Sequence, residues 1–204
     1  MTFERARAAV AGVLIGMAGL LWSRKAQASA APVGELAYPD PIGWLDSAPV
    51  YESVPVIDRE SANLAAFLAM IRAGEGTAGP NGYRTLVGGG LFYGYADHPR
   101  QSVYLPSLGI HSTAAGAYQF LARTWDSIRG NLPDFSPASQ DAAAVALIKR
   151  RGAYADVLAG RLALALEKCS WEWASLPPFR YSGQGTLSAG RASQIYADAG
   201  GHIA

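Results

Sequence analysis

Glu75 stands between two glycines, Gly74 and Gly76, directly after a stretch with helical periodicity. Because the glycines carry no side chains, a bulky ligand can approach the carboxylate closely. A carboxylate at a helix C-terminus meets the negative end of the helix dipole, and partial burial adds a desolvation cost, so both effects raise its pKa. A general acid that protonates a glycosidic oxygen needs such a raised pKa. On its own the tripeptide is weak evidence for catalysis, because most glutamates in such a setting are solvated turn residues.

The composition argues against several other kinds of chemistry. Cys169 is the only cysteine, so no intramolecular disulfide can form, and the three histidines lack Cys or His partners at zinc spacing. We expect Cys169 to be a small buried apolar group, and we expect no metal and no organic cofactor. The formal net charge is +1 and no basic run is longer than residues 149–151, which gives no electrostatic reason to expect a nucleic-acid partner.

The elements that must position Glu75 are predicted to be mostly helices. Between residues 58 and 73, apolar residues recur at i, i+3, i+4 and i+7, which predicts an amphipathic helix that ends at Gly74. A second helix is expected over residues 117–129, and a third over residues 136–151, where Ser136-Pro137 supplies an N-cap and first-turn pair. Shorter helical stretches are expected at residues 153–159, 161–168, 171–175 and 189–199.

One small sheet is expected beside these helices. Residues 83–95 combine Thr, Val, Leu and aromatic residues with three consecutive glycines, which favours a short, irregular hairpin. No internal repeat is visible, so a solenoid is not expected. The predicted fold class is α+β, mainly helical, with one small β-hairpin or flap.

The N-terminus has the features of an export signal. Arg5 and Arg7 precede an uncharged apolar stretch over residues 8–22, and Ala-x-Ala tripeptides follow within residues 26–30. As a helix the apolar stretch would span about 22 Å, which is short of the roughly 30 Å of a bilayer core. We expect residues 1–30 to be either a cleaved signal peptide or a signal-arrest-release segment that is tethered to the inner membrane before it escapes.

The rest of the chain is expected to form a linker and one domain. Residues 31–57 contain five prolines and no helical period, which predicts an extended linker. The folded domain is expected to cover residues 58–204, because the chain is too short for two full domains after this linker.

Short blocks of residues along the whole predicted domain, including the one at Glu75, match a known family. The blocks are Glu75-Gly76-Thr77, Gly82-Tyr83, Val87-Gly88-Gly89, Leu91-Phe92, Asp97-His98-Pro99-Arg100, Ser112-Thr113, Tyr118-Gln119, Asp134-Phe135-Ser136-Pro137, Ser139-Gln140-Asp141-Ala142, Arg151-Gly152-Ala153, Cys169-Ser170, Trp173-Ala174-Ser175-Leu176-Pro177 and Tyr181. Through these blocks, in this order, the chain resembles the lambda-phage lysozyme family, the lytic transglycosylase-type endolysins of the lysozyme-like superfamily.

The resemblance implies a lysozyme-like fold with the flap beside a cleft, and an enzyme that cuts peptidoglycan glycan strands and lyses the cell wall. We expect the enzyme to be a monomer, and its export is expected from residues 1–30 and not from the resemblance. Glu75 matches the family's catalytic glutamate, which protonates the oxygen between N-acetylmuramic acid and N-acetylglucosamine. The same group then deprotonates the muramic 6-hydroxyl, so that a 1,6-anhydro sugar forms. This chemistry needs one acid/base and no carboxylate nucleophile.

The substrate-binding residues expected from the matched blocks are Tyr118, Gln119, Tyr181, Ser112 and Asp97. All except Gln119 have a structural alternative: a core aromatic for Tyr118, a packing role for Tyr181, a bond to local backbone for Ser112, and a cap or turn for Asp97 together with His98.

Two other functions stay open at this point. A hydrolytic muramidase would use a second carboxylate, Asp97 or Asp126, to position water, and a non-catalytic wall-binding module would keep only the fold. The chain also departs from the family pattern in a shorter loop between Thr77 and Gly82, in Arg84 at an acidic position, and in its export segment.

Overall fold

The computed structural model describes residues 58–180 and 187–204. The predicted export segment at residues 1–30, the predicted linker at residues 31–57 and Tyr181 therefore lie outside the described residues. No helix within the described ranges is long and apolar enough to cross a membrane. The elements are α1 (Arg59–Gly74), η1 (Gly82–Arg84), η2 (Val87–Gly89), β1 (Val103–Leu105), β2 (Ile110–Ser112), α2 (Ala122–Ile128), α3 (Pro137–Arg150), α4 (Tyr154–Leu158), α5 (Leu162–Cys169) and α6 (Ala189–Asp198).

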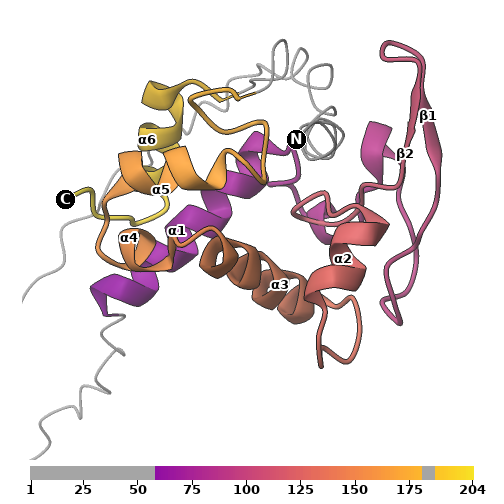
Figure 1. Ribbon diagram of the computed structural model, residues 1–204, viewed down its shortest axis with the longest axis horizontal. Coiled ribbons are helices and arrows are strands. Elements are labelled where there is room, and N and C mark those ends of the chain that lie inside the picture. The colour runs from indigo at the N-terminus through magenta and orange to yellow at the C-terminus, as the bar shows by residue number, and fades with distance from the viewer. Residues whose placement is uncertain (1–57, 181–186) are drawn as a thin grey trace, which may run out of the picture.

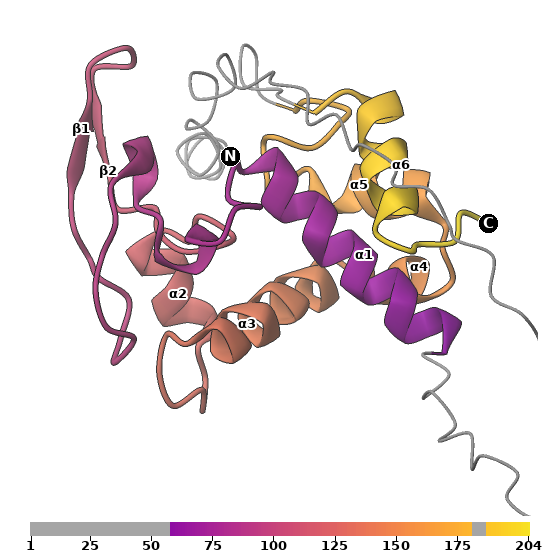
Figure 2. The same cartoon turned by 180° about the vertical axis from the view of Figure 1, so that it is seen from behind.

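Helix α1 runs through the middle of the molecule, with α4, α5 and α6 at one end and the β-hairpin at the other (Figures 1 and 2). Asp58 caps its N-terminus by accepting a hydrogen bond from the Ser61 backbone N–H at 2.9 Å. The helix packs against α4 and α6. The amphipathic helix predicted over residues 58–73 is confirmed, and its apolar face is buried at Phe67, Met70 and Ile71.

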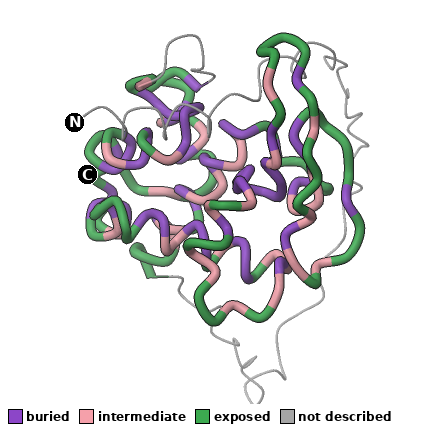
Figure 3. The backbone as a smooth tube through the Cα atoms, turned by 45° about the vertical axis from the view of Figure 1, so that its right-hand side comes forward, coloured by how far each residue is buried: buried purple, intermediate pink, exposed green. Residues whose placement is uncertain are grey.

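The main core gathers side chains from most of the described elements, as the buried stretches of the chain in Figure 3 illustrate. Its aromatic centre is Trp125, whose ring centroid lies 4.8 Å from that of Phe135. Phe135 in turn packs against Phe92. Cys169 is a free thiol in this core, and burial raises its pKa to about 12, which confirms the prediction that it is a buried apolar group.

Helix α3 confirms the predicted Ser136-Pro137 start. The Ser136 hydroxyl accepts a hydrogen bond from the Ser139 backbone N–H, and Pro137 occupies the first turn, where its missing N–H leaves no helical bond unmade. The short helices predicted near α4, α5 and α6 are confirmed to within one or two residues at each end. The short helix predicted at residues 171–175 is wrong, because these residues form turns.

The predicted sheet is only partly where the sequence placed it, because the paired strands lie later in the chain. Its strands are β1 and β2, an antiparallel pair with Val103 opposite Ser112 and Leu105 opposite Ile110. Residues 83–95 do turn back on themselves in an irregular way, because an antiparallel bridge joins Thr85 to Leu91 and the Leu86 N–H donates to the Gly90 carbonyl at 2.7 Å. They form no paired strands, and Gly88 and Gly89 at this turn have φ values of 79° and 91°. These left-handed conformations turn the chain sharply and exclude an extended strand. The α+β, mainly helical fold class is nevertheless confirmed, with one two-stranded sheet in the described part of the chain.

The helix predicted over residues 117–129 begins only at Ala122. Ala115 and Phe120 exchange two backbone hydrogen bonds of 3.0 Å each, which closes a tight loop before the helix. Gln119 within this loop has a φ of 49°, which no α-helix tolerates. This loop carries two of the predicted substrate-binding residues.

Asn63 joins three distant parts of the fold from a fully buried position on α1. Its Nδ2 donates to the Leu158 carbonyl at 2.9 Å, and its Oδ1 accepts from the His202 backbone N–H at 2.7 Å. The side chain thereby ties the end of α4 and the C-terminal tail to α1.

We expect Asn63→Ala to lower the free energy of unfolding by about 2–4 kcal/mol, since it empties a fully buried position and removes two part-buried hydrogen bonds, to the Leu158 carbonyl and from the His202 N–H. Urea denaturation of the purified variant measures this loss. Gln194→Ala is the control, because its hydrogen bond to Asp198 is exposed on α6. Equal stabilities for the two variants would show that Asn63 does not hold these segments together.

Candidate active site

Glu75 is the C-cap of α1, as the sequence predicted, and the chain turns away from the helix immediately after it. Gly76 has a φ of 69°, its N–H donates to the Ala73 carbonyl, and the Thr77 N–H donates to the Arg72 carbonyl. This pair of bonds closes the helix in a Schellman motif, in which glycine takes the left-handed position at no steric cost. The glycine after Glu75 is therefore required by the backbone turn.

The Glu75 carboxyl group is buried, with 6% of the residue exposed. The Ser175 hydroxyl donates a hydrogen bond to its Oε1 at 2.6 Å. Burial raises the pKa of Glu75 from 4.5 to about 7, although the bond from Ser175 works in the opposite direction. No salt bridge among the described residues involves Glu75, and residues 181–186 contain no Asp, Glu, Lys, Arg or His. Glu75 can therefore act as a proton donor near neutral pH.

Two loops meet at Glu75, and both are fixed to the same short segment. The Thr77 hydroxyl donates to the Ala117 carbonyl at 2.5 Å, and the Trp173 indole N–H donates to the next carbonyl, that of Tyr118, at 3.2 Å. Thr77 follows Glu75 by two residues, and Trp173 precedes Ser175 by two. Residues 117–118 thus set the spacing between the carboxyl group and the hydroxyl that binds it.

Gln119 lies next to this segment and is buried, with 5% exposed. Its Nε2 donates to the Gly116 carbonyl at 2.9 Å and to the Thr85 carbonyl at 3.1 Å. These two acceptors fix which end of the amide is nitrogen. Its Oε1 is buried and accepts no hydrogen bond from any described residue. The Gln119 Oε1 is therefore a buried acceptor that no described residue satisfies.

Tyr118 is a member of the core, with only 2% exposed. Its hydroxyl donates to Asp141 Oδ1 at 2.6 Å, and the Tyr83 hydroxyl donates to the same oxygen at 2.8 Å. Arg72 Nη1 donates to the Tyr83 hydroxyl at 3.2 Å. Burial, together with Asp141, raises the pKa of Tyr118. This geometry favours the core alternative for Tyr118, and its substrate-binding role stays a prediction.

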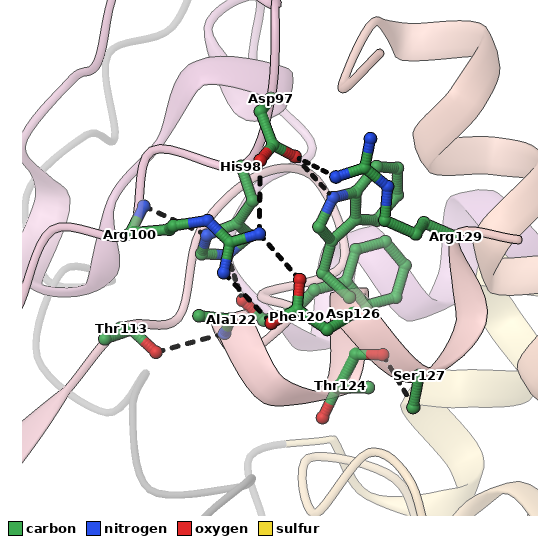
Figure 4. A network of polar contacts seen from close by, with 11 residues as sticks. Asp97, His98, Arg100, Thr113, Phe120, Ala122, Thr124, Asp126, Ser127 and Arg129 are labelled. Carbon is green, nitrogen blue, oxygen red and sulfur yellow. Dashed lines mark hydrogen bonds and ion pairs between the residues drawn. The ribbon is translucent and has the colours of Figure 1, made fainter. Parts of the chain in front are cut away.

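Asp97 belongs to a network of charged groups between its loop and α2 (Figure 4). Its Oδ1 accepts from Trp125 Nε1 at 2.8 Å and from Arg129 at 2.9 Å. Arg100 bridges Asp97 to Asp126, with contacts of 3.1 Å and 2.6 Å. Partial burial alone would raise the pKa of Asp97, but the bonds from Trp125 and Arg100 outweigh it and lower the pKa to about 2. Both carboxylates are occupied by arginines, which fits the turn-stabilising alternative for Asp97.

The neighbouring polar residues also bond within the protein. His98 Nε2 lies 2.8 Å from the Phe120 carbonyl, while its Nδ1 accepts from the Arg100 backbone N–H at 3.0 Å. This pair of contacts assigns the neutral Nε2–H tautomer. Ser112 is buried at the end of β2, and its hydroxyl accepts from the Ala114 N–H at 3.2 Å. Ser112 therefore makes the local backbone bond that was its structural alternative, and contact with sugar stays a prediction.

No role was predicted for Ser175, which contacts Glu75, or for Thr77, which fixes the loop after it. Both residues lie inside blocks that match the endolysins, so the match marked their positions but did not indicate what they do. Ser175 is separated from Glu75 by 100 residues, so no local spacing could pair them.

A family model for endolysins matches residues 65–203. The chain belongs to the endolysin family. It is 44% identical over 147 residues to the endolysin of Escherichia phage lambda, which covers 68% of this chain and 91% of that protein. It is 40% identical over 164 residues to the endolysin of Escherichia phage P2, which covers 72% of this chain and 98% of that protein.

Solved structures agree with this membership of the endolysin family. Bacteriophage lambda lysozyme complexed with a chitohexasaccharide superposes with a TM-score of 0.65 at 39% identity, covering 70% of this chain and 97% of that one. A second lambda lysozyme structure gives a TM-score of 0.61 at 40% identity, with the same coverage. The lysozyme-like fold is thereby confirmed, and the chain is a lysozyme-type endolysin that degrades peptidoglycan.

The titration of Glu75 has a consequence for stability. Because its pKa is raised from 4.5 to about 7 in the folded protein, stability is full below pH 4.5 and falls as the pH rises through 7. We expect Glu75→Gln to gain about 3 kcal/mol relative to the native chain between pH 4.5 and pH 8, since the amide does not ionise. Urea denaturation across this range measures the difference.

Glu60→Gln is the matched control for this experiment, because Glu60 is exposed in the first turn of the same helix. Its stability difference from the native chain should stay constant over the same pH range. A constant difference for Glu75→Gln as well would mean that the Glu75 pKa is not raised.

Proposed function

We propose that the chain is a lytic transglycosylase that cleaves the β-1,4 bond between N-acetylmuramic acid and N-acetylglucosamine and leaves a 1,6-anhydro-muramic end. The observation that carries the proposal is a buried carboxyl group, Glu75, with a pKa of about 7 and a serine as its hydrogen-bond partner. Such a group suits a reaction that needs one residue to act as acid and then as base.

The proposed reaction returns Glu75 to its starting state. The protonated carboxyl gives its proton to the glycosidic oxygen as the bond from that oxygen to C1 breaks. The Glu75 carboxylate, with the Ser175 hydroxyl still on Oε1, then takes the proton of the muramic 6-hydroxyl. The freed oxygen closes onto C1. One bond to C1 breaks and one forms, and no water is consumed.

Gln119 supports a glycan as the bound molecule. Its buried Oε1 has no donor among the described residues, and the N–H of an acetamido group is a donor of the required kind. Both sugars of peptidoglycan carry acetamido groups, and the lambda lysozyme structure holds a chitohexasaccharide. We therefore propose that Gln119 accepts a hydrogen bond from an acetamido group of the strand.

A hydrolytic mechanism would need a second carboxylate free to position water. Asp97 and Asp126 were the candidates for that role; Asp97 is bonded to Arg100 and Arg129, and Asp126 is bonded to Arg100. Using either one would require these contacts to break. Their arrangement therefore favours transglycosylation, and a hydrolytic product is the outcome that would reverse this preference.

We also propose that the enzyme acts as a monomer in the periplasm, after export through residues 1–30. The cationic start, the uncharged stretch at residues 8–22 and the Ala-x-Ala tripeptides support export. Mass spectrometry of the periplasmic protein would distinguish cleavage near residue 30 from release of the whole chain.

We expect the full-length protein to release 1,6-anhydro-muropeptides from purified peptidoglycan, as read by mass spectrometry. Glu75→Gln should lower the rate at least about a hundredfold, because the amide can neither donate nor accept the proton. Glu60→Gln should retain the native rate. Products with reducing ends would indicate hydrolysis, and absence of products from the native protein would indicate a wall-binding module.

A further inference from the structure

Ser175 makes a contact with Glu75 that the reaction scheme does not by itself require. The residue is buried, with 5% exposed, and its hydroxyl donates to Oε1 at 2.6 Å. No other described residue forms a hydrogen bond with the Glu75 side chain. The serine is therefore the one group among the described residues that can stabilise the carboxylate once Glu75 has lost its proton.

The backbone around Ser175 holds this hydroxyl in place. Trp173 is anchored through its indole to the Tyr118 carbonyl, and the Leu187 N–H donates to the Ser175 carbonyl at 3.2 Å. Ser175 is thus fixed on both sides along the chain. Its hydroxyl is aimed at Glu75 before any substrate binds.

Gly74 leaves the space that this contact needs. A Cβ at position 74 would lie 2.9 Å from the Ser175 Oγ and 3.3 Å from the Ser175 Cβ, which is too close for both to remain. Gly74 is the last residue of α1 and, unlike Gly76, is not in a left-handed conformation. Its small size is therefore needed for packing against Ser175, whereas Gly76 is needed for the backbone turn.

We propose that Ser175 is a positioning residue for Glu75: its hydroxyl engages Oε1, leaves Oε2 as the oxygen that transfers the proton, and stabilises the carboxylate between the two proton transfers. Gly74 makes this arrangement sterically possible. The inference rests on the proposed role of Glu75 as acid and base.

The pH dependence of the reaction separates this role from simple packing. The rate at low substrate concentration falls at high pH as the Glu75 acid loses its proton. Without the Ser175 hydroxyl the carboxylate is less stable, so the protonated form persists to higher pH. We expect Ser175→Ala to move the alkaline limb of the pH–rate profile to higher pH by roughly one to two pH units. This is the shift that corresponds to the loss of one hydrogen bond to a charged group.

The experiment compares full-length variants over pH 5–10 by release of soluble muropeptides. Gly74→Ala should move the limb in the same direction, because it displaces the serine. Ser175→Cys keeps the side-chain volume with a weaker donor and should move it less, which keeps the test available if the alanine variant does not fold. Ser193→Ala on α6 is the control, and its limb should not move.

The possible outcomes distinguish the positioning role of Ser175 from the proposed function of Glu75. An inactive Glu75→Gln protein together with an unmoved limb in folded Ser175→Ala and Ser175→Cys would overturn the positioning role alone. A Glu75→Gln protein with native activity would overturn the proposed function, whatever Ser175 does. Inactive Glu75→Gln with the expected upward shifts would support both.

Discussion

Desolvation of the Glu75 carboxyl group is the constraint on which the rest of the site depends. A buried carboxylate without a cation is costly, and a single hydrogen bond from Ser175 does not offset that cost, so the protonated form persists to about pH 7. A nearby arginine would have stabilised the fold at neutral pH and lowered the pKa. Without such an arginine the fold is less stable at neutral pH, but Glu75 stays protonated and can donate its proton.

The surrounding fold keeps this group in one position. The Schellman motif at Gly76 fixes where α1 ends, and Thr77 and Trp173 bond successive carbonyls of the loop at residues 117–118. The distance between Glu75 and Ser175 is thus set by two side chains, Thr77 and Trp173, that bond to the backbone of one short segment. The arginines of the fold are used elsewhere, where Arg100 and Arg129 hold Asp97 against α2.

The sequence predicted the elements whose signals are local. Helix α1 follows from its apolar spacing, and α3 follows from Ser136-Pro137, because the first turn of a helix is determined by the residues in it. The position of Glu75 at the end of α1 and the upward direction of its pKa were predicted for the same reason. Its catalytic role rests on the resemblance to endolysins and stays a prediction.

The features that were missed depend on left-handed backbone turns and on one contact between distant residues. The sheet was expected at residues 83–95 because the β-branched and aromatic content there is high, but the segment with the left-handed Gly88 and Gly89 forms only one antiparallel bridge, between Thr85 and Leu91. The start of α2 depends on the pairing of Ala115 with Phe120 and on the left-handed Gln119. The partner of Glu75 required the folded chain, since Ser175 reaches it only after the C-terminal segment has packed.

The most direct test of this account is a carbon NMR titration of the Glu75 carboxyl group, assigned by its absence from the spectrum of Glu75→Gln. The account predicts a titration midpoint of about 7. A midpoint near the ordinary value of 4.5 would contradict it, because the carboxyl would then be ionised at neutral pH and unable to serve as the proton donor.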